Sequence, residues 1–193
     1  MTHYFKPESP GRKVLISLYI HGQSFQFQSY TSLFSGSSID LGTRLLLDNI
    51  KIPSSGEILD VGCGYGAIGI VVAKLNPSLK VYMTDVNPLA VKTAKINAKL
   101  NKVEDRVTVL LGDRYEPVKN MSFDAIYSNP PLSAGMSIVE DIVLGAAEHL
   151  KPGGFAQFVL AKGGEALARK ARSKYKIAEA TSKKGYILLY LKP

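Results

Sequence analysis

Cysteine is almost absent from this chain of 193 residues, and its scarcity limits both chemistry and environment. Cys63 is the only cysteine, so no disulfide can form within the chain, and a reducing compartment is expected. No apolar run reaches the roughly 18 residues of a membrane span. Charged residues interrupt the first 30 positions, which therefore lack a signal-peptide pattern. The sequence predicts a cytoplasmic protein that does not enter a membrane.

Histidine is also scarce, and this argues against a metal site. His3, His21 and His149 have no spacing that would let them share an ion, so no metal is predicted. Internal repeats and low-complexity linkers are absent as well. With 46% hydrophobic residues, the chain is expected to fold as one domain over residues 1–193.

Positive charge, by contrast, is in excess, and only at one end of the chain. The net charge is +8. Residues 1–150 contain 14 basic and 14 acidic side chains, whereas residues 151–193 contain 10 and 2. This asymmetry indicates an anionic partner, RNA above all, for the region 151–193, although a solvated lysine-rich surface is the alternative. The candidates for phosphate contacts are Lys162, Arg169, Lys170, Arg172, Lys174, Lys176, Lys183 and Lys184.

A glycine-rich loop carries the strongest local pattern. Residues 57–61 have strand character, Gly62, Gly64 and Gly66 follow at alternate positions, and a helical pattern begins at once. Glycine lets a ligand approach the main chain, and the helix N-terminus offers free N–H groups, so this loop predicts nucleotide binding. From Gly64 the spacing also fits the dinucleotide fingerprint, so the loop alone does not identify the nucleotide. Cys63, inside the loop, is expected to be a small buried residue rather than a nucleophile.

Strands and helices alternate after this loop. Strands are expected at 57–61, 80–85, 106–111, 123–128 and 154–160, and helices at 66–76, 87–101, 137–150 and 163–173. Pro152-Gly153-Gly154 is expected to end a helix and start a strand. Two last strands, 175–180 and 185–191, are joined through 181–184 and must be antiparallel because their connection is short. The sequence predicts an α/β fold: a doubly wound, Rossmann-like, seven-stranded sheet, mostly parallel, with one antiparallel strand near its C-terminal edge.

The N-terminal segment predicts a separate β-hairpin. Residues 13–20 are apolar, residues 24–30 alternate polar and aromatic, and His21-Gly22 supplies the turn. We expect residues 1–36 to form an appendage that covers or extends the ligand cleft. The core then spans 37–193, with a helix that begins near Ile39 and uses Asp40 as its cap.

Two aspartates end successive core strands. Asp85 follows Gly66 by 19 residues, where an acid accepts hydrogen bonds from ribose hydroxyls in doubly wound folds; a capping role before Asn87-Pro88 is the alternative. Asp113 follows the third strand and would face the same crevice. A carboxylate there can accept from an exocyclic amine such as that of adenine, and a simple loop acid is the alternative.

The stretch Asn129-Pro130-Pro131-Leu132 ends the strand 123–128. Two prolines fix an extended backbone, and the Asn129 amide oxygen and the Pro130 carbonyl are acceptors. Two acceptors held at a sheet edge can grip a planar –NH2 group and orient its lone pair toward an electrophile. A structural Pro-Pro turn is the alternative.

This order of motifs resembles an amino-directed class I S-adenosylmethionine (SAM)-dependent methyltransferase. The segment from Phe34 to Leu47 is similar to the lead-in of the methyltransferase small-domain family, as in 16S ribosomal RNA (guanine-N2)-methyltransferases, and the likeness covers roughly residues 25–191. It implies that Asn129, Pro130, Pro131 and Leu132 form the catalytic segment, in which Asn129 and Pro130 hold the target amine. It implies that SAM is bound by Asp60, Gly62, Gly64, Gly66, Asp85, Asp113, Asn129 and, near the methionine end, Thr43.

Two departures from the family affect the substrate. Bacterial members of the ribosomal RNA group often carry a second, degenerate methyltransferase-like half, so docking here must use the hairpin, the basic region or a second copy of the chain in a homodimer. Many members also have an aromatic residue where this chain has Leu132, which cannot stack as a π-face on a flipped base. The residues that would supply a ring instead are Phe25, Phe27, Tyr30 and Phe34, although core packing is expected for most of them.

The predicted function is methylation of an exocyclic amine in RNA, with guanine N2 in ribosomal RNA favoured over a flipped adenine in DNA. Methylation of a protein glutamine is an alternative, because its amide fits the same pair of acceptors. An NAD-binding oxidoreductase or a non-catalytic nucleotide-binding module would explain the glycines and Asp85, but not Asn129-Pro130-Pro131 or the antiparallel ending.

Overall fold

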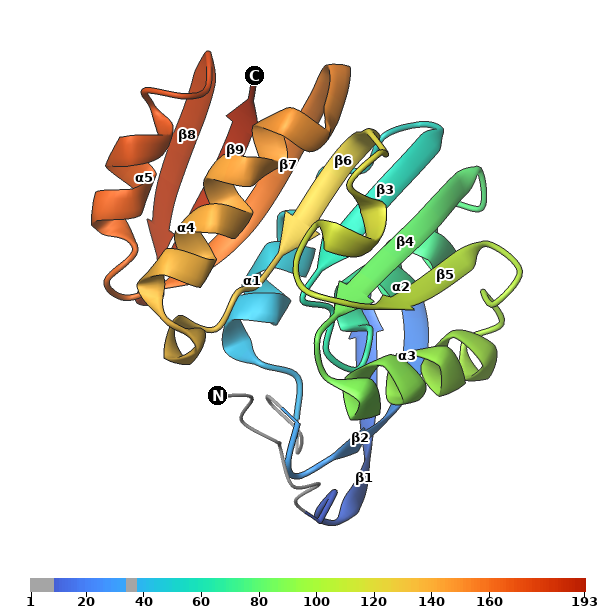
Figure 1. Cartoon of the computed structure of the whole chain (residues 1–193). Coiled ribbons are helices and arrows are strands. Elements are labelled where there is room, and N and C mark those ends of the chain that lie inside the picture. The colour runs from blue at the N-terminus through green and yellow to red at the C-terminus, as the bar shows by residue number, and fades with distance from the viewer. Residues whose placement is uncertain (1–8, 34–37) are drawn as a thin grey trace, which may run out of the picture.

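A seven-stranded sheet forms the centre of the computed structural model, which describes residues 9–33 and 38–193. Its strand order is β5-β4-β3-β6-β7-β9-β8 (Figure 1). β9 pairs antiparallel with both β7 and β8, and the other pairs are parallel. The predicted fold class is therefore confirmed. The strands are β3 (Gly56–Val61), β4 (Leu79–Asp85), β5 (Val107–Leu111), β6 (Phe123–Ser128), β7 (Leu150–Ala161), β8 (Ile177–Lys183) and β9 (Tyr186–Lys192).

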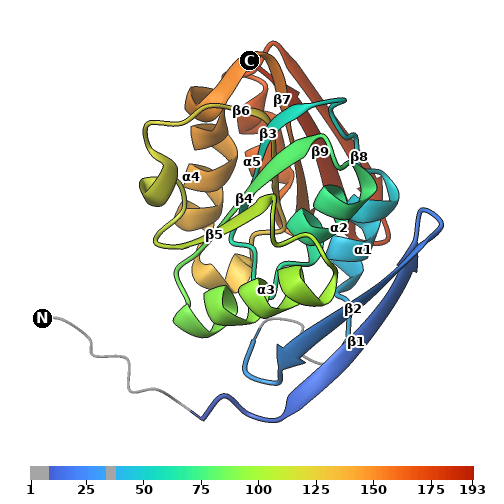
Figure 2. The ribbon, with the colours of Figure 1, turned by 90° about the vertical axis from the view of Figure 1, so that its right-hand side faces the viewer.

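Helices cover both faces of this sheet, as a parallel sheet requires. One face carries α1 (Leu41–Asp48), α2 (Ala67–Leu75) and α3 (Pro88–Leu100), and the other carries α4 (Met136–Gly145) and α5 (Glu165–Ala171) (Figure 2). α2 is buried over most of its length, whereas α3 presents lysines to solvent. In the described part of the chain, no helix is long and apolar enough to cross a membrane.

Two predicted connections at the C-terminal side are wrong in detail. Pro152-Gly153-Gly154 lies inside β7, which begins at Leu150, because a register shift against β6 lets the strand pass these residues. Residues 181–183 belong to β8, since Lys184 (φ +50°) and Gly185 (φ +80°) alone make the turn. Two left-handed residues suit the twist of a tight hairpin, so the strands need no longer connection. The helix predicted at 137–150 ends as α4 at Gly145 and continues as a 3-10 helix over Ala146–His149.

The predicted N-terminal hairpin is present as a separate sheet of β1 (Lys13–Ile20) and β2 (Gln23–Tyr30), turning at His21-Gly22. Side-chain amides of α3 attach it to the core. The Asn97 amide bonds both the N–H and the carbonyl of Gln28, at 2.7 and 2.8 Å, and Asn101 does the same for Gln26. The hairpin thus packs on α3 (Figure 2). The boundary predicted between residues 36 and 37 lies outside the described residues, and the single-domain assignment stays a prediction.

Candidate active site

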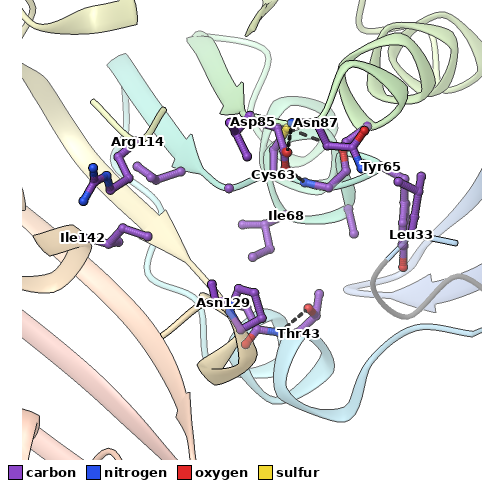
Figure 3. A pocket seen from close by; sticks show the side chains of 18 of the residues that line it. Leu33, Thr43, Cys63, Tyr65, Ile68, Asp85, Asn87, Arg114, Asn129 and Ile142 are labelled. Atoms are coloured by element: carbon purple, nitrogen blue, oxygen red, sulfur yellow. Dashed lines mark hydrogen bonds between the residues drawn. The ribbon is translucent and has the colours of Figure 1, made fainter. Parts of the chain in front are cut away.

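A pocket of about 250 Å³ opens at the carboxyl edge of the sheet. The loops after β3, β4, β5 and β6 and the start of α1 contribute its lining. Figure 3 shows Asp85 and Asn87 on one side of it and Thr43 and Asn129 on the opposite side. Most of the predicted site residues therefore meet at one cavity.

The glycine loop forms one wall. Gly62 (φ +68°) and Gly64 (φ +56°) line the pocket in left-handed conformations that favour glycine, and a Cβ added at either would meet no atom within 4 Å. Gly66 (φ +95°) serves packing instead, because a Cβ there would approach Ile70 Cδ1 at 2.8 Å. The first two glycines leave room for a ligand against the main chain, and the third lets α2 approach its neighbours.

Asp85 fixes this loop from the end of β4. Its Oδ2 accepts from Gly64 N at 2.8 Å, and its Oδ1 accepts from Asn87 N at 2.9 Å. Asn87 in turn caps α3. Asp85 therefore has the capping-type contact that was the alternative and also lines the pocket, where its remaining lone pairs face the ligand space. Its role toward ribose stays a prediction.

Asp60 lies beneath the glycine loop rather than among the residues that line the pocket. Its side chain is fully buried, Oδ2 accepts from Gly69 N at 2.9 Å, and Oδ1 has no partner. Burial raises the pKa of Asp60 to about 7, the Gly69 hydrogen bond opposes the shift, and Asp85 adds to it. An unpartnered buried carboxylate oxygen is the kind of atom that a cationic amino group stabilises.

Asp113 lines the pocket together with a residue that the sequence did not single out, Arg114. The guanidinium donates to both oxygens of Asp113, from Nε at 3.0 Å and from Nη2 at 2.6 Å, and also binds Asp141. These carboxylates raise the pKa of Arg114, with the Asp113 hydrogen bond as the main cause. Asp113 is thus charge-paired, and each oxygen keeps a lone pair for a further donor.

Asn129 is held by the beginning of α1. Its Nδ2 donates to Asp40 Oδ2 at 2.6 Å and to Thr43 Oγ1 at 2.9 Å. We call Asp40, Thr43 and Asn129 the amide clamp. Sequence reasoning identified Asp40 only as a helix cap and placed Thr43 near the cofactor, so their shared contact with Asn129 was missed. It joins segments 89 residues apart, and local spacing gives no sign of it.

The other three residues of the Asn-Pro-Pro-Leu segment lie in different surroundings. Pro131 lines the pocket, whereas Pro130 is buried and Leu132 packs against the apolar cluster under α4. Neither Pro130 nor Leu132 is among the lining residues of this pocket. The catalytic roles predicted for them stay predictions.

The aromatic residues considered for stacking pack mostly elsewhere. Phe25 and Phe27 are buried in the core cluster that the hairpin shares with α2 and α3, and Tyr30 packs against the same cluster. Phe34 lies outside the described residues. Tyr65, inside the glycine loop, lines the pocket and its ring lies 5.6 Å from that of Phe27. Among the described residues, the aromatic side chain that lines the pocket is therefore in the glycine motif itself.

Cys63 also lines the pocket but is poorly suited to nucleophilic chemistry. Burial, then Asp60 and Asp85, raise the pKa of its thiol well above the usual range, so it stays protonated. His149 stacks on Tyr115 at 4.5 Å, away from the pocket. Within residues 9–33 and 38–193, no group of three His, Cys, Asp or Glu side chains is arranged to hold a metal ion.

The sequence of this chain is similar to those of known proteins. Residues 24–189 match the family described as methyltransferase small domain. The uncharacterized protein YbxB of Bacillus subtilis is 34% identical, with 98% of each chain covered. The protein named ribosomal RNA small subunit methyltransferase C of Photorhabdus laumondii is 38% identical over 66% of this chain and 38% of its own length. The chain spans about two fifths of the length of such ribosomal RNA methyltransferases.

Solved structures show the same fold. A T. thermophilus 16S rRNA N2 methyltransferase in complex with AdoMet and guanosine superposes with a TM-score of 0.81, at 23% identity, over 96% of this chain and 52% of that chain. The family match covers most of the chain, and it agrees with the structural similarity and with the order of the sequence motifs. The chain therefore belongs to the methyltransferase small domain family, as its sequence predicted.

Proposed function

We propose that this protein is a SAM-dependent N-methyltransferase that acts on an exocyclic amine of RNA, with guanine N2 in ribosomal RNA as the favoured target. Membership of a methyltransferase family confirms the predicted cofactor and overturns the NAD-binding alternative. The names of the curated relatives support the substrate class, although the chain matches only part of their length. The reaction is proposed to take place in the cytoplasm.

The observation that carries this proposal is the orientation of Asn129. Both of its amide protons are donated to the amide clamp, so its Oδ1 is left as an acceptor at the pocket. When bound, SAM supplies a sulfonium-activated methyl group, whose carbon bonds the target nitrogen as the carbon–sulfur bond breaks and a proton passes to water. Asn129 Oδ1 accepts from the target –NH2 and aims its lone pair, which is catalysis by position rather than by a strong base.

Other pocket residues fit the cofactor's groups. The open main chain at Gly62 and Gly64 admits its body, and Asp85 offers acceptors to ribose hydroxyls. The basic region 151–193 is the proposed RNA-binding part. A homodimer would supply a second copy of the domain to a chain that spans about two fifths of the length of these relatives.

The test is transfer of labelled methyl from SAM to ribosomal RNA and to isolated small ribosomal subunits, followed by digestion to nucleosides. Label in N2-methylguanosine is expected. Label in protein glutamine would support the alternative substrate, and no transfer to either would contradict the proposal.

Asn129→Ala tests the site itself. We expect unchanged SAM affinity by calorimetry and a loss of turnover of at least about 100-fold, the scale for removing one positioned polar group. Asp48→Asn is the matched control, because Asp48 ends α1 and forms only an exposed ion pair with Arg44. Turnover near the wild-type level in Asn129→Ala would show that the amine binds elsewhere.

A further inference from the structure

The amide of Asn129 has a defined orientation that follows from the chemistry of its partners. A primary amide has two N–H donors, and both are used, one by Asp40 Oδ2 and one by Thr43 Oγ1. A carboxylate only accepts, so the amide nitrogen, and not the oxygen, must face Asp40. The amide oxygen consequently points away from the start of α1.

Asp40 is itself held in place. Its Oδ2 also accepts from Thr43 N at 3.0 Å, which makes Asp40 the N-cap of α1 with an extended backbone. A Cβ added at Gly42 would come within 3.0 Å of Asp40 Oδ2 and 2.8 Å of the Tyr186 ring, so space around the carboxylate is tight. Asp40 therefore has little freedom to release Asn129.

We propose that Asp40 is a positioning residue for the transfer reaction, acting through Asn129 rather than on the substrate. The proposal rests on the proposed function, in which Asn129 Oδ1 binds the target amine. A reversed amide would direct its NH2 group at the –NH2 of the substrate, donor against donor. The charged acceptor excludes that orientation, and its charge-assisted hydrogen bond polarises the amide so that Oδ1 accepts more strongly.

Asp40→Asn separates positioning from capping. Asparagine caps a helix as well as aspartate, so α1 and the melting temperature should be preserved. The same atom, Asp40 Oδ2, accepts from Thr43 N and from Asn129 Nδ2, so an asparagine that caps α1 presents a neutral oxygen to Asn129 and the charge-assisted hydrogen bond is lost. We expect kcat to fall about tenfold with SAM affinity unchanged, and no change in the control Asp48→Asn.

A double-mutant cycle with Asn129→Ala shows whether Asp40 acts through Asn129. In labelled methyl transfer to ribosomal RNA, Asp40→Asn should cost about tenfold in the wild-type background and less than twofold in Asn129→Ala. Equal losses in both backgrounds, or no loss in the first, would overturn the proposal. Wild-type turnover in Asn129→Ala would instead contradict the proposed function, so the two failures are distinguishable.

An exchange of the two side chains serves where Asn129→Ala is too slow to measure. Asn129→Asp alone places two carboxylates face to face, which should strongly reduce turnover. The pair Asp40→Asn with Asn129→Asp removes one of the two facing charges, and should recover at least tenfold over Asn129→Asp. No recovery would overturn the positioning role.

The strand register shows where some of the basic residues lie relative to the pocket. Tyr186, the first residue of β9, pairs with Ala161 at the end of β7 and with Lys183 at the end of β8. The β8–β9 turn and the loop after β7 are therefore neighbours at the carboxyl edge, the edge at which the pocket opens; in Figure 1 the β8 arrow points toward this edge. Lys162 follows β7, Lys183 ends β8 and Lys184 lies in the β8–β9 turn.

These three lysines are exposed, and in the described part of the chain they form no ion pair, whereas Lys170 and Lys174 are paired with Glu140 and Glu148. Lys184 also adopts a left-handed conformation, which is unfavourable for a non-glycine residue. His21 has the same conformation in the first hairpin, but its ring contacts Leu47 O at 2.7 Å. We infer that Lys162, Lys183 and Lys184 contact RNA phosphates beside the target nucleotide.

Two variants with the same charge change test this surface. Lys183→Gln with Lys184→Gln removes two charges at the carboxyl edge, and Lys176→Gln with Lys192→Gln removes two at the opposite end of the same strands. RNA affinity is measured from 50 to 200 mM salt. The first pair should weaken binding about tenfold and reduce the slope of log affinity against log salt by about 1.5, as for two lost phosphate contacts.

The control pair should have a clearly smaller effect on both quantities, and neither pair should change SAM affinity. Equal weakening by both pairs would overturn the assignment of the surface. Wild-type protein without salt-dependent RNA binding would overturn it too, and with it the RNA substrate.

Discussion

The two walls of the pocket are held by contacts that span different lengths of the chain. On the glycine-loop side, the fixing contacts are local: Asp85 bonds Gly64 across 21 residues, and Asp60 bonds Gly69 across 9. On the side of the amide clamp, Asp40 and Asn129 are 89 residues apart. One wall is a product of a single strand–loop–helix–strand unit, and the other depends on the docking of α1 against the end of β6.

We propose separate functions for the two walls. In this proposal the glycine-loop side offers main-chain space and acceptors to the cofactor, and the amide clamp orders one side chain toward the substrate. Variants of the first should change SAM affinity or the stability of the loop, and variants of the second should change turnover. Variants on either side of the pocket test this division.

Asp60→Asn should change the pH dependence of stability. The folded-state pKa of about 7 lies above the unfolded value of about 3.9, so the folded state retains a proton that the unfolded state loses. The stability contributed by protonated Asp60 is present below pH 4 and is lost as the pH rises to about 7, by about 4 kcal/mol for three pKa units. Urea unfolding between pH 4.5 and 8 should therefore favour the variant progressively, and parallel profiles would contradict this.

Asp85→Ala should weaken SAM binding by roughly 100-fold, because it removes acceptors for the ligand and releases the Gly64 N–H. At saturating SAM, kcat should change little. Calorimetry and steady-state kinetics together measure both quantities. A fall in kcat at unchanged affinity would mean that the two walls do not divide cofactor binding and turnover as we infer.

Thr43→Val should have the smallest effect, about a fivefold loss of kcat, because it removes one neutral acceptor from the Asn129 amide. The SAM dissociation constant should stay the same. The sequence predicted instead that Thr43 lies near the methionine end of SAM. A raised dissociation constant with unchanged kcat would favour that earlier interpretation over a role in the amide clamp.

The sequence allowed the fold and the glycine-loop side to be predicted because both follow from short-range patterns. The alternation of strands and helices, the three glycines and Asp85 are set by local spacing, and the turn at His21-Gly22 was identified correctly. The features that were predicted wrongly or missed depend on contacts between distant parts of the chain. β7 starts before Pro152 because β6 pairs with it, and Arg114 was missed because its partner Asp141 is on α4. The link from Asp40 to Asn129 is of the same kind.

The long separation of Asp40 and Asn129 also has a consequence for folding. Closing a contact across 89 residues costs more chain entropy than closing the local contacts of the glycine loop, so it is expected to form late, after β3, β6 and β7 have paired. A partly folded chain can then shape the cofactor wall while its Asn129 amide still rotates freely. Under the proposed role of Asn129, only the completely folded chain would then transfer the methyl group.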